Sequence, residues 1–405
     1  MRQRKLGMFG AALVVGAALL APGEADARCR NTGSFERWMD GFKREALAQG
    51  ISRQAIAAAL DGVAFDPAII RRDSGQGVFT QSFLQFAGRM TGGGRHRNGL
   101  KQMKANARLL GAIEQRTGVP PAVVTALWGL ESDYGAYKGG KYSIIRSVAT
   151  LAYDCRRPEF FRPQLMAILR IVQRGDLRPE EMIGNWAGEL GPTQFTPLDY
   201  FRSGVDFDGD GRVDMIRSTP DALASAANLL KNFGWKRGQP WLQEVRLPRD
   251  MPWQEADVAI QHPVSQWARW GVAAAHGRLP ADNLPASLIL LMGRNGPAFL
   301  AYPNFNAYLE WNKAIVYATT AAYFATRLAG APPVGPGNAK VDWPDAKEVQ
   351  AMQRLLIARG FLEGDADGVM GSQTRAAVKQ AQLKYGLPAD SYPTPELSAR
   401  LSGGR

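Results

Sequence analysis

The chain has 405 residues, of which 45% are hydrophobic and 21% are charged. A domain usually holds roughly 100–200 residues, so this length predicts one sizeable core together with a second, small domain. The formal charge of +12 suits an anionic partner, but the basic residues are scattered and form no stripe, which argues against nucleic acid and favours an anionic cell envelope.

The first 27 residues have the pattern of an export signal. Three basic side chains lie within the first five residues, an apolar run covers residues 7–21, and Ala-Asp-Ala at 25–27 matches a signal-peptidase site. The run is shorter than the ~20 residues that span a bilayer, so cleavage is favoured over a membrane anchor. We expect a mature protein outside the cytoplasm, without stable membrane insertion.

Two cysteines follow this segment, Cys29 and Cys155. In an oxidising compartment a disulfide between them is the simplest assignment. Two buried free thiols are the alternative, because sequence spacing cannot establish that the two sulfurs meet.

The main body reads as one helix after another from residue 34 to about 328. Apolar residues recur at helical spacing, for example over Phe35–Gln49, and few stretches alternate in the way that marks a strand. The sequence therefore predicts a mainly α domain, which we place at residues 28–328.

A Pro/Gly-rich segment at residues 329–341 has little to bury and predicts a linker. Beyond it, residues 342–405 show helical patterns at Ala346–Arg359 and Gln373–Tyr385, separated by Gly-containing turns. These features predict a small C-terminal helical bundle.

One predicted helix carries a carboxylic acid on its apolar face. It opens at Pro121, and at 100° per residue from Val123 the side chain of Glu131 falls at about 80°, within the apolar stripe. Burial disfavours the charged form and raises the pKa, which suits an acid that protonates a glycosidic oxygen. A structural Glu, satisfied by an Arg or by backbone amides, is the alternative. Asp133 falls on the opposite face and is expected to cap the helix or lie at the surface.

Other catalytic patterns are missing from the sequence. The histidines at 96, 262 and 276 match no metal-ligand spacing, and no Gly-x-Ser-x-Gly motif occurs, which argues against a zinc amidase or a serine hydrolase. The glycine-rich stretch at residues 91–97 predicts a mobile loop, with contact to a ligand as the less favoured interpretation.

Several motifs together resemble the lytic murein transglycosylase B family. They are WGLESDYG at residues 128–135, NWAG at 185–188, GPTQFTP at 191–197 and DFDGDG at 206–211. The resemblance covers roughly residues 33–328. Residues 345–401 resemble the peptidoglycan-binding domain that is often appended to such enzymes.

This resemblance implies a lysozyme-like, mainly α fold with a C-terminal three-helix module, in a monomeric periplasmic enzyme acting on the glycan strands of peptidoglycan. It assigns Glu131 as the sole acid and base that cleaves the MurNAc–GlcNAc β-1,4 bond, first protonating the leaving oxygen and then accepting a proton from the 6-hydroxyl to close a 1,6-anhydro ring. A hydrolytic muramidase and a non-catalytic wall-binding protein are the alternatives.

The resemblance also suggests residues that contact the sugar. Asn185 and Gln194 match polar positions in the family's groove. Trp186, Tyr302 and Trp311 could stack against sugars, although aromatic residues in a helical body are more often part of the core. The chain departs from many members at Pro192-Thr193 and at Glu189-Leu190, which affects fine substrate preference rather than the reaction.

The acidic loop follows the pattern of a calcium site, with aspartates at positions 1, 3 and 5 and Gly211 at position 6. Arg217 occupies position 12, where a bidentate Glu is usual, so a later acid must complete the shell. The resemblance to the family's longer loop assigns that role to Asp221. The expected Ca²⁺ ligands are Asp206, Asp208, Asp210, the carbonyl of Arg212, and Asp221. A metal-free network of Asx turns is the alternative.

Overall fold

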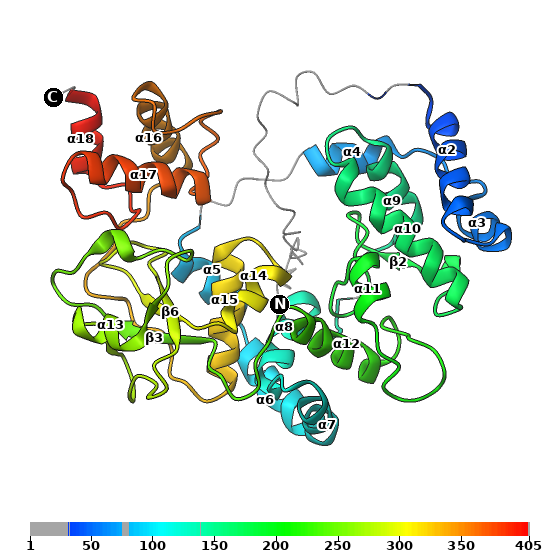
Figure 1. Ribbon diagram of the computed structural model, residues 1–405, viewed down its shortest axis with the longest axis horizontal. Helices are drawn as coiled ribbons and strands as arrows, with labels where there is room; N and C mark the ends of the chain where they lie inside the picture. The colour runs from blue at the N-terminus through cyan, green and yellow to red at the C-terminus, as the bar shows by residue number, and fades with distance from the viewer. Residues whose placement is uncertain (1–30, 32, 75–80, 138, 404–405) are drawn as a thin grey trace, which may run out of the picture.

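The computed structural model describes residues 31, 33–74, 81–137 and 139–403 (Figure 1). The predicted signal segment and Cys29 lie outside these residues. Within the described part of the chain, buried apolar side chains gather in four clusters: two in the helical body, one beneath a small sheet and one in the C-terminal module. No helix of this part is long and apolar enough to cross a membrane.

The body is mainly α, as predicted. Several of its helices begin where a serine side chain accepts a hydrogen bond from the backbone N–H three residues later, which satisfies an otherwise free donor. Its helices before the sheet are α2 (Phe35–Ala48), α3 (Arg53–Leu60), α4 (Pro67–Ser74), α5 (Phe83–Thr91), α6 (Arg95–Ala105), α7 (Ala107–Thr117), α8 (Pro121–Ser132), α9 (Ile144–Tyr153), α10 (Pro158–Arg174), α11 (Pro197–Ser203) and α12 (Thr219–Asn232). The helices within and after the sheet are α13 (Val264–Arg269), α14 (Phe305–Trp311) and α15 (Ile315–Leu328).

Helix α8 is buried on every side, not along a single stripe as the sequence suggested. Helices α6, α7, α12 and α15 all pack against it, and Figure 1 shows it at the centre of the body. The predicted role of Asp133 as a cap is confirmed, because it ends α8 in the left-handed conformation (φ 50°) and its carboxylate pairs with Arg95 at 3.2 Å.

A five-stranded antiparallel sheet was missed by the sequence analysis. Its order is β4-β6-β7-β3-β5. The strands are β3 (Leu242–Arg246), β4 (His262–Pro263), β5 (Ala273–Ala274), β6 (Pro285–Ile289) and β7 (Ala298–Ala301), and a separate pair is formed by β1 (Tyr142–Ser143) and β2 (Ile183–Gly184). Two of the three inner strands, β6 and β7, are buried along almost their whole length, so they lack the alternation that identifies a half-exposed strand.

The C-terminal module consists of α16 (Ala346–Ala358), α17 (Ser372–Lys384) and α18 (Pro395–Gly403) around its own apolar core. It is docked on the rest of the chain by charged groups. The Lys379 ammonium lies 2.9 Å from the Asp257 carboxylate, and Arg294 lies 3.0 Å from Asp390. The Arg375 guanidinium donates to the Leu291 carbonyl at 2.7 Å. Figure 1 shows the module beside the sheet.

The predicted linker at residues 329–341 is not a free tether. Val334 packs against the main core, and its N–H donates to the Tyr323 hydroxyl at 3.2 Å. The N–H of Gly335 donates to the Glu244 carboxylate at 2.8 Å. The expectation that this segment has nothing to bury was wrong, because it crosses the surface of the body and is held there by backbone hydrogen bonds.

Candidate active site

Glu131 lies in the last turn of α8, and its side chain is buried with a residue exposure of 5%. Its carboxylate accepts hydrogen bonds from the Trp311 indole N–H at 2.9 Å and from the Tyr317 hydroxyl. Helices α14 and α15 position these two donors, since Trp311 ends α14 and Tyr317 lies in the first turn of α15. Both hydrogen bonds end on Oε1, which leaves Oε2 to carry a proton.

The surroundings of Glu131 hold it near its protonation midpoint at neutral pH. Burial raises the pKa of Glu131 from 4.5 to about 7, although the hydrogen bonds from Tyr317 and Trp311 stabilise the carboxylate and act in the opposite direction. A group with this pKa can donate a proton and then accept one at the same pH. Among the described residues, neither an Arg nor a backbone amide bonds to the carboxylate, so the partners expected of a purely structural Glu are not found there.

The loop at residues 185–195 brings the two predicted polar residues together. Asn185 Nδ2 donates to Gln194 Oε1 at 3.2 Å, and both side chains are buried. Gln194 adopts a left-handed conformation (φ 49°), and its amide also donates to the Gly191 carbonyl at 2.7 Å. The loop therefore fixes both amides by internal bonds, and their contact with a sugar stays a prediction.

A second carboxyl group lies in this site. Glu189 accepts a hydrogen bond from Asn185 Nδ2 at 2.6 Å, and burial together with the negative charge of Glu131 raises the pKa of Glu189 to about 8. The sequence showed Glu189 only as a departure from the family pattern. Tyr317 had no sequence signal, because a Tyr in a buried helix is ordinarily a core residue.

The three aromatic candidates have different surroundings. Trp311 donates its indole N–H to Glu131. Its ring packs edge-on against Phe195, with the two ring centroids 5.6 Å apart. Trp186 is half-buried and packs against the core of the N-terminal helices. Tyr302 is buried beneath the sheet with 1% exposure, so the structure gives it the core role and corrects the stacking interpretation.

The acidic loop gathers three carboxylates. Ligand oxygens of Asp206, Asp208 and Asp210 all lie within 4.8 Å of one another. Hard oxygen donors at this spacing fit Ca²⁺, which binds six to eight oxygens. The Asp206 carboxylate also accepts the N–H groups of Gly209 and Gly211, at 2.7 and 2.9 Å, so Asx-type turns shape the same loop.

Asp221 is not one of these three carboxylates, although it contacts the same loop. It is fully buried, and its carboxylate accepts the backbone N–H groups of Phe207, at 2.8 Å, and Asp214, at 2.8 Å. These bonds tie the two ends of the loop together, and the role of Asp221 as the ligand that completes the shell stays a prediction. The side chain of Arg212 pairs with Asp214 at 3.0 Å, and its carbonyl stays a predicted ligand.

Cys155 forms a disulfide bond. Its predicted partner, Cys29, lies outside the described residues, so this pairing stays a prediction.

A mainly α body whose central buried helix ends in one protonatable carboxylic acid is the arrangement of a lysozyme-like, glycan-cleaving enzyme. The comparison with known families agrees with this class. Residues 34–326 match the family described as the transglycosylase SLT domain, and residues 345–401 match a putative peptidoglycan-binding domain. The chain belongs to the transglycosylase SLT family.

The chain is also similar to individual relatives. It is 30% identical over 204 residues to membrane-bound lytic murein transglycosylase B of Escherichia coli, a match that covers 50% of this chain and 55% of that relative. The match thus spans about half the length of the curated relative.

Among solved structures, SltB3 of Pseudomonas aeruginosa, in complex with NAG-anhNAM-pentapeptide, is 42% identical, with a TM-score of 0.83 over 92% of this chain and 100% of SltB3. The Escherichia coli lytic transglycosylase Slt35, in complex with calcium, is 24% identical, with a TM-score of 0.62 over 72% of this chain and 92% of Slt35. The similarity to Slt35 supports the fold alone.

Proposed function

We propose that this chain is a lytic transglycosylase that cleaves the MurNAc–GlcNAc β-1,4 bond of peptidoglycan and leaves 1,6-anhydro-MurNAc ends. The observation that carries the proposal is Glu131, a buried acid with a pKa of about 7 and two hydrogen-bond donors on one oxygen. The similarity to SltB3, whose solved complex contains NAG-anhNAM-pentapeptide, supports the same reaction.

In the first step, Glu131 Oε2 gives its proton to the glycosidic oxygen as the bond to the anomeric carbon breaks. The carboxylate that remains is stabilised by Trp311 and Tyr317. In the second step, the 6-hydroxyl of the MurNAc residue attacks its own anomeric carbon, and the Glu131 carboxylate takes the hydroxyl proton. The acid is thereby restored without a water molecule, so one titrating side chain acts twice.

A hydrolytic muramidase is the second candidate function, and Glu189 is the observation that favours it. A second carboxyl group near the acid is what ordinary glycosidases use to activate water or to form a covalent intermediate. The raised pKa of Glu189, about 8, keeps it mostly neutral at pH 7 and makes it a poor base there. A mostly neutral Glu189 cannot readily activate water at pH 7, so the transglycosylase reaction is favoured over hydrolysis.

Digestion of purified peptidoglycan separates the two reactions. Mature protein should release anhydro-muropeptides, identified by mass, and Glu131→Gln should release none. The control Glu310→Gln alters an exposed Glu on α14 that pairs with Lys313, and it should retain activity. Reducing-end products would instead identify a hydrolase, and an inactive wild type would favour a wall-binding protein.

The finer assignments follow from the same proposal. Asn185 and Gln194 contact the sugar chain. The three loop aspartates, the Arg212 carbonyl and Asp221 hold a structural Ca²⁺ beside the groove, an idea supported by the calcium complex of Slt35. The C-terminal module binds the cell wall. The protein acts as a monomer in the periplasm after cleavage of its signal segment.

A further inference from the structure

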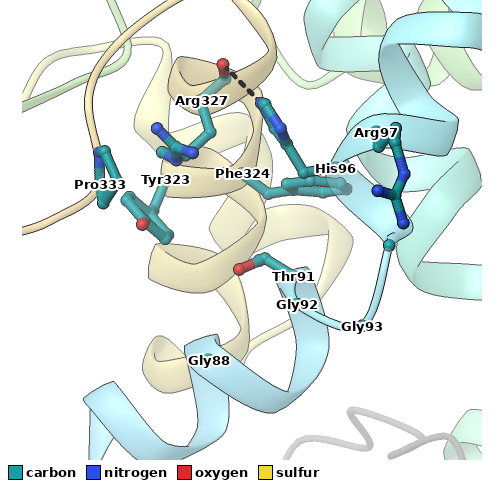
Figure 2. A pocket seen from close by; sticks show the side chains of 11 residues that line it. Gly88, Thr91, Gly92, Gly93, His96, Arg97, Tyr323, Phe324, Arg327 and Pro333 are labelled. Carbon is teal, nitrogen blue, oxygen red and sulfur yellow. Dashed lines mark hydrogen bonds between the residues drawn. The ribbon is translucent and has the colours of Figure 1, made fainter.

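A cavity of about 400 Å³ lies where the end of α5, the turn at residues 92–94 and the start of α6 face the last turns of α15 (Figure 2). It belongs to none of the sites described above. The side chains and glycines that line it include Gly93, His96, Arg97, Tyr323, Phe324, Arg327 and Pro333.

The lining is cationic. It contains two arginines and one histidine, and none of its residues is acidic. Arg97 is exposed, and among the described residues its guanidinium has no hydrogen-bond or ion-pair partner. Arg327 donates only Nη1, to the Ala331 carbonyl at 2.7 Å, and forms no ion pair with the described part of the chain. The cavity therefore holds positive charge that the described residues leave uncompensated.

The backbone adds to this charge. Helix α6 begins after Gly94 without a side-chain cap, and its first turn holds no acidic residue. The positive end of a helix normally attracts an acid, yet here Arg95, His96 and Arg97 occupy that turn. Only Arg95 is neutralised, by Asp133. The opposite wall is apolar, formed by Phe324, the Tyr323 ring and Pro333.

We propose that this cavity binds a carboxylate-bearing peptide, the peptide carried by the glycan substrate. Guanidinium groups bind carboxylates through paired hydrogen bonds, and an apolar wall favours a ligand with aliphatic parts over a bare inorganic anion. A volume of about 400 Å³ accommodates two or three small residues.

This inference rests on the proposed function, since the glycan supplies the peptide. Two helices that line the cavity, α6 and α15, pack against the helix that carries Glu131. Helix α6 packs against α8, and the Tyr134 hydroxyl donates to the Arg95 carbonyl at 2.7 Å. A peptide held in the cavity would thus be anchored close to the end of α8, and would help to fix the register of the glycan strand.

Gly93 offers a matched pair of variants. Its φ of +61° lies in the left-handed region, which Asn and Asp tolerate better than other residues, and a Cβ there would meet no atom within 4 Å. Gly93→Asp places a negative charge at the mouth of the cavity, whereas Gly93→Asn adds nearly the same volume without the charge. Arg97→Gln removes one guanidinium from an exposed position.

The binding test uses the full chain and the peptide fraction released from purified peptidoglycan by an amidase, with inorganic phosphate as a second probe. We expect the peptide to bind the wild type and Gly93→Asn with similar Kd, and to bind Gly93→Asp and Arg97→Gln about tenfold more weakly. Because the chain has only three histidines, the ring resonances of His96 can report the bound site directly.

Equal Kd values for Gly93→Asp and Gly93→Asn, or no peptide binding, would overturn the inference. Tighter binding of phosphate than of peptide would overturn it too, and would point to a phosphate-bearing lipid or polymer. An assay of peptidoglycan cleavage distinguishes a failure of this binding inference from a failure of the proposed function. Release of anhydro-muropeptides that depends on Glu131 would uphold the function even if the cavity bound nothing.

Discussion

At the scale of single residues, the hydrogen bond from Tyr317 lowers the pKa of Glu131 and thereby helps to set the pH above which activity is lost. Glu131 must be protonated for the first step, so activity is expected to fall as the pH rises through about 7. The Tyr317 hydroxyl stabilises the carboxylate, and Tyr317→Phe should therefore raise the pKa of Glu131 further. A hydrogen bond to a charged group contributes roughly 1.5–3 kcal/mol, which corresponds to about one to two pH units.

The measurement is the pH profile of kcat/KM for Tyr317→Phe, whose alkaline limb should move to higher pH while kcat decreases. Tyr308→Phe is the control, because it removes a buried hydroxyl that has no hydrogen-bond partner in the described part of the chain and so does not bond to Glu131. An unchanged limb in Tyr317→Phe would show that this hydroxyl does not set the pKa of Glu131.

At the scale of elements, α8 depends on a glycine for its packing. A Cβ at Gly129 would lie 2.7 Å from the Tyr134 ring, too close for either group to keep its position. Gly129→Ala should lower the free energy of unfolding by roughly 1–3 kcal/mol, as overpacking does. Gly111→Ala, in α7, meets nothing within 4 Å and should instead stabilise by about 0.5–1 kcal/mol. Urea unfolding measures both, and equal effects would refute the packing argument.

The acidic loop provides a second test at this scale. Three carboxylates within 4.8 Å of one another repel when no cation is present. Millimolar Ca²⁺ should raise the Tm of the wild type and chelation should lower it, whereas Asp208→Asn should respond much less. A Tm that does not respond to calcium would favour the alternative, a metal-free loop held by Asx turns.

At the scale of the whole molecule, the C-terminal module has a fixed orientation. Lys379 is 7% exposed, and its ammonium pairs with Asp257. Lys379→Met should weaken this docking by roughly 1–3 kcal/mol and increase proteolysis in residues 329–341. Lys384→Met, at an exposed position of the same helix, is the control. Unchanged proteolysis of Lys379→Met would mean that this ion pair does not hold the module.

This fixed orientation changes how the module would contribute to activity. A mobile tether raises the local concentration of an enzyme without directing it. A docked module would hold Glu131 at a set angle to any wall strand that the module bound. The prediction of a linker at residues 329–341 followed from composition. Composition cannot show that backbone N–H groups of this segment donate hydrogen bonds to side chains of the body.

The sequence by itself determined what depends on neighbouring residues. The start of α8 at Pro121, the burial of Glu131, the helix end at Asp133 and the acidic loop follow from local spacing and residue type. Apolar periodicity also predicted two helices of the C-terminal module, α16 and α17, whereas the third followed only from the resemblance to a peptidoglycan-binding domain.

Tertiary structure decided what depends on residues far apart in the chain. Tyr317 reaches Glu131 across 186 positions of sequence, and no local pattern distinguishes it from an ordinary core tyrosine. Strands β6 and β7 escaped detection because both of their faces are buried. The cationic cavity likewise exists only where α15 meets the start of α6. Contacts of this kind are fixed by packing between elements, and the sequence of either element alone does not contain them.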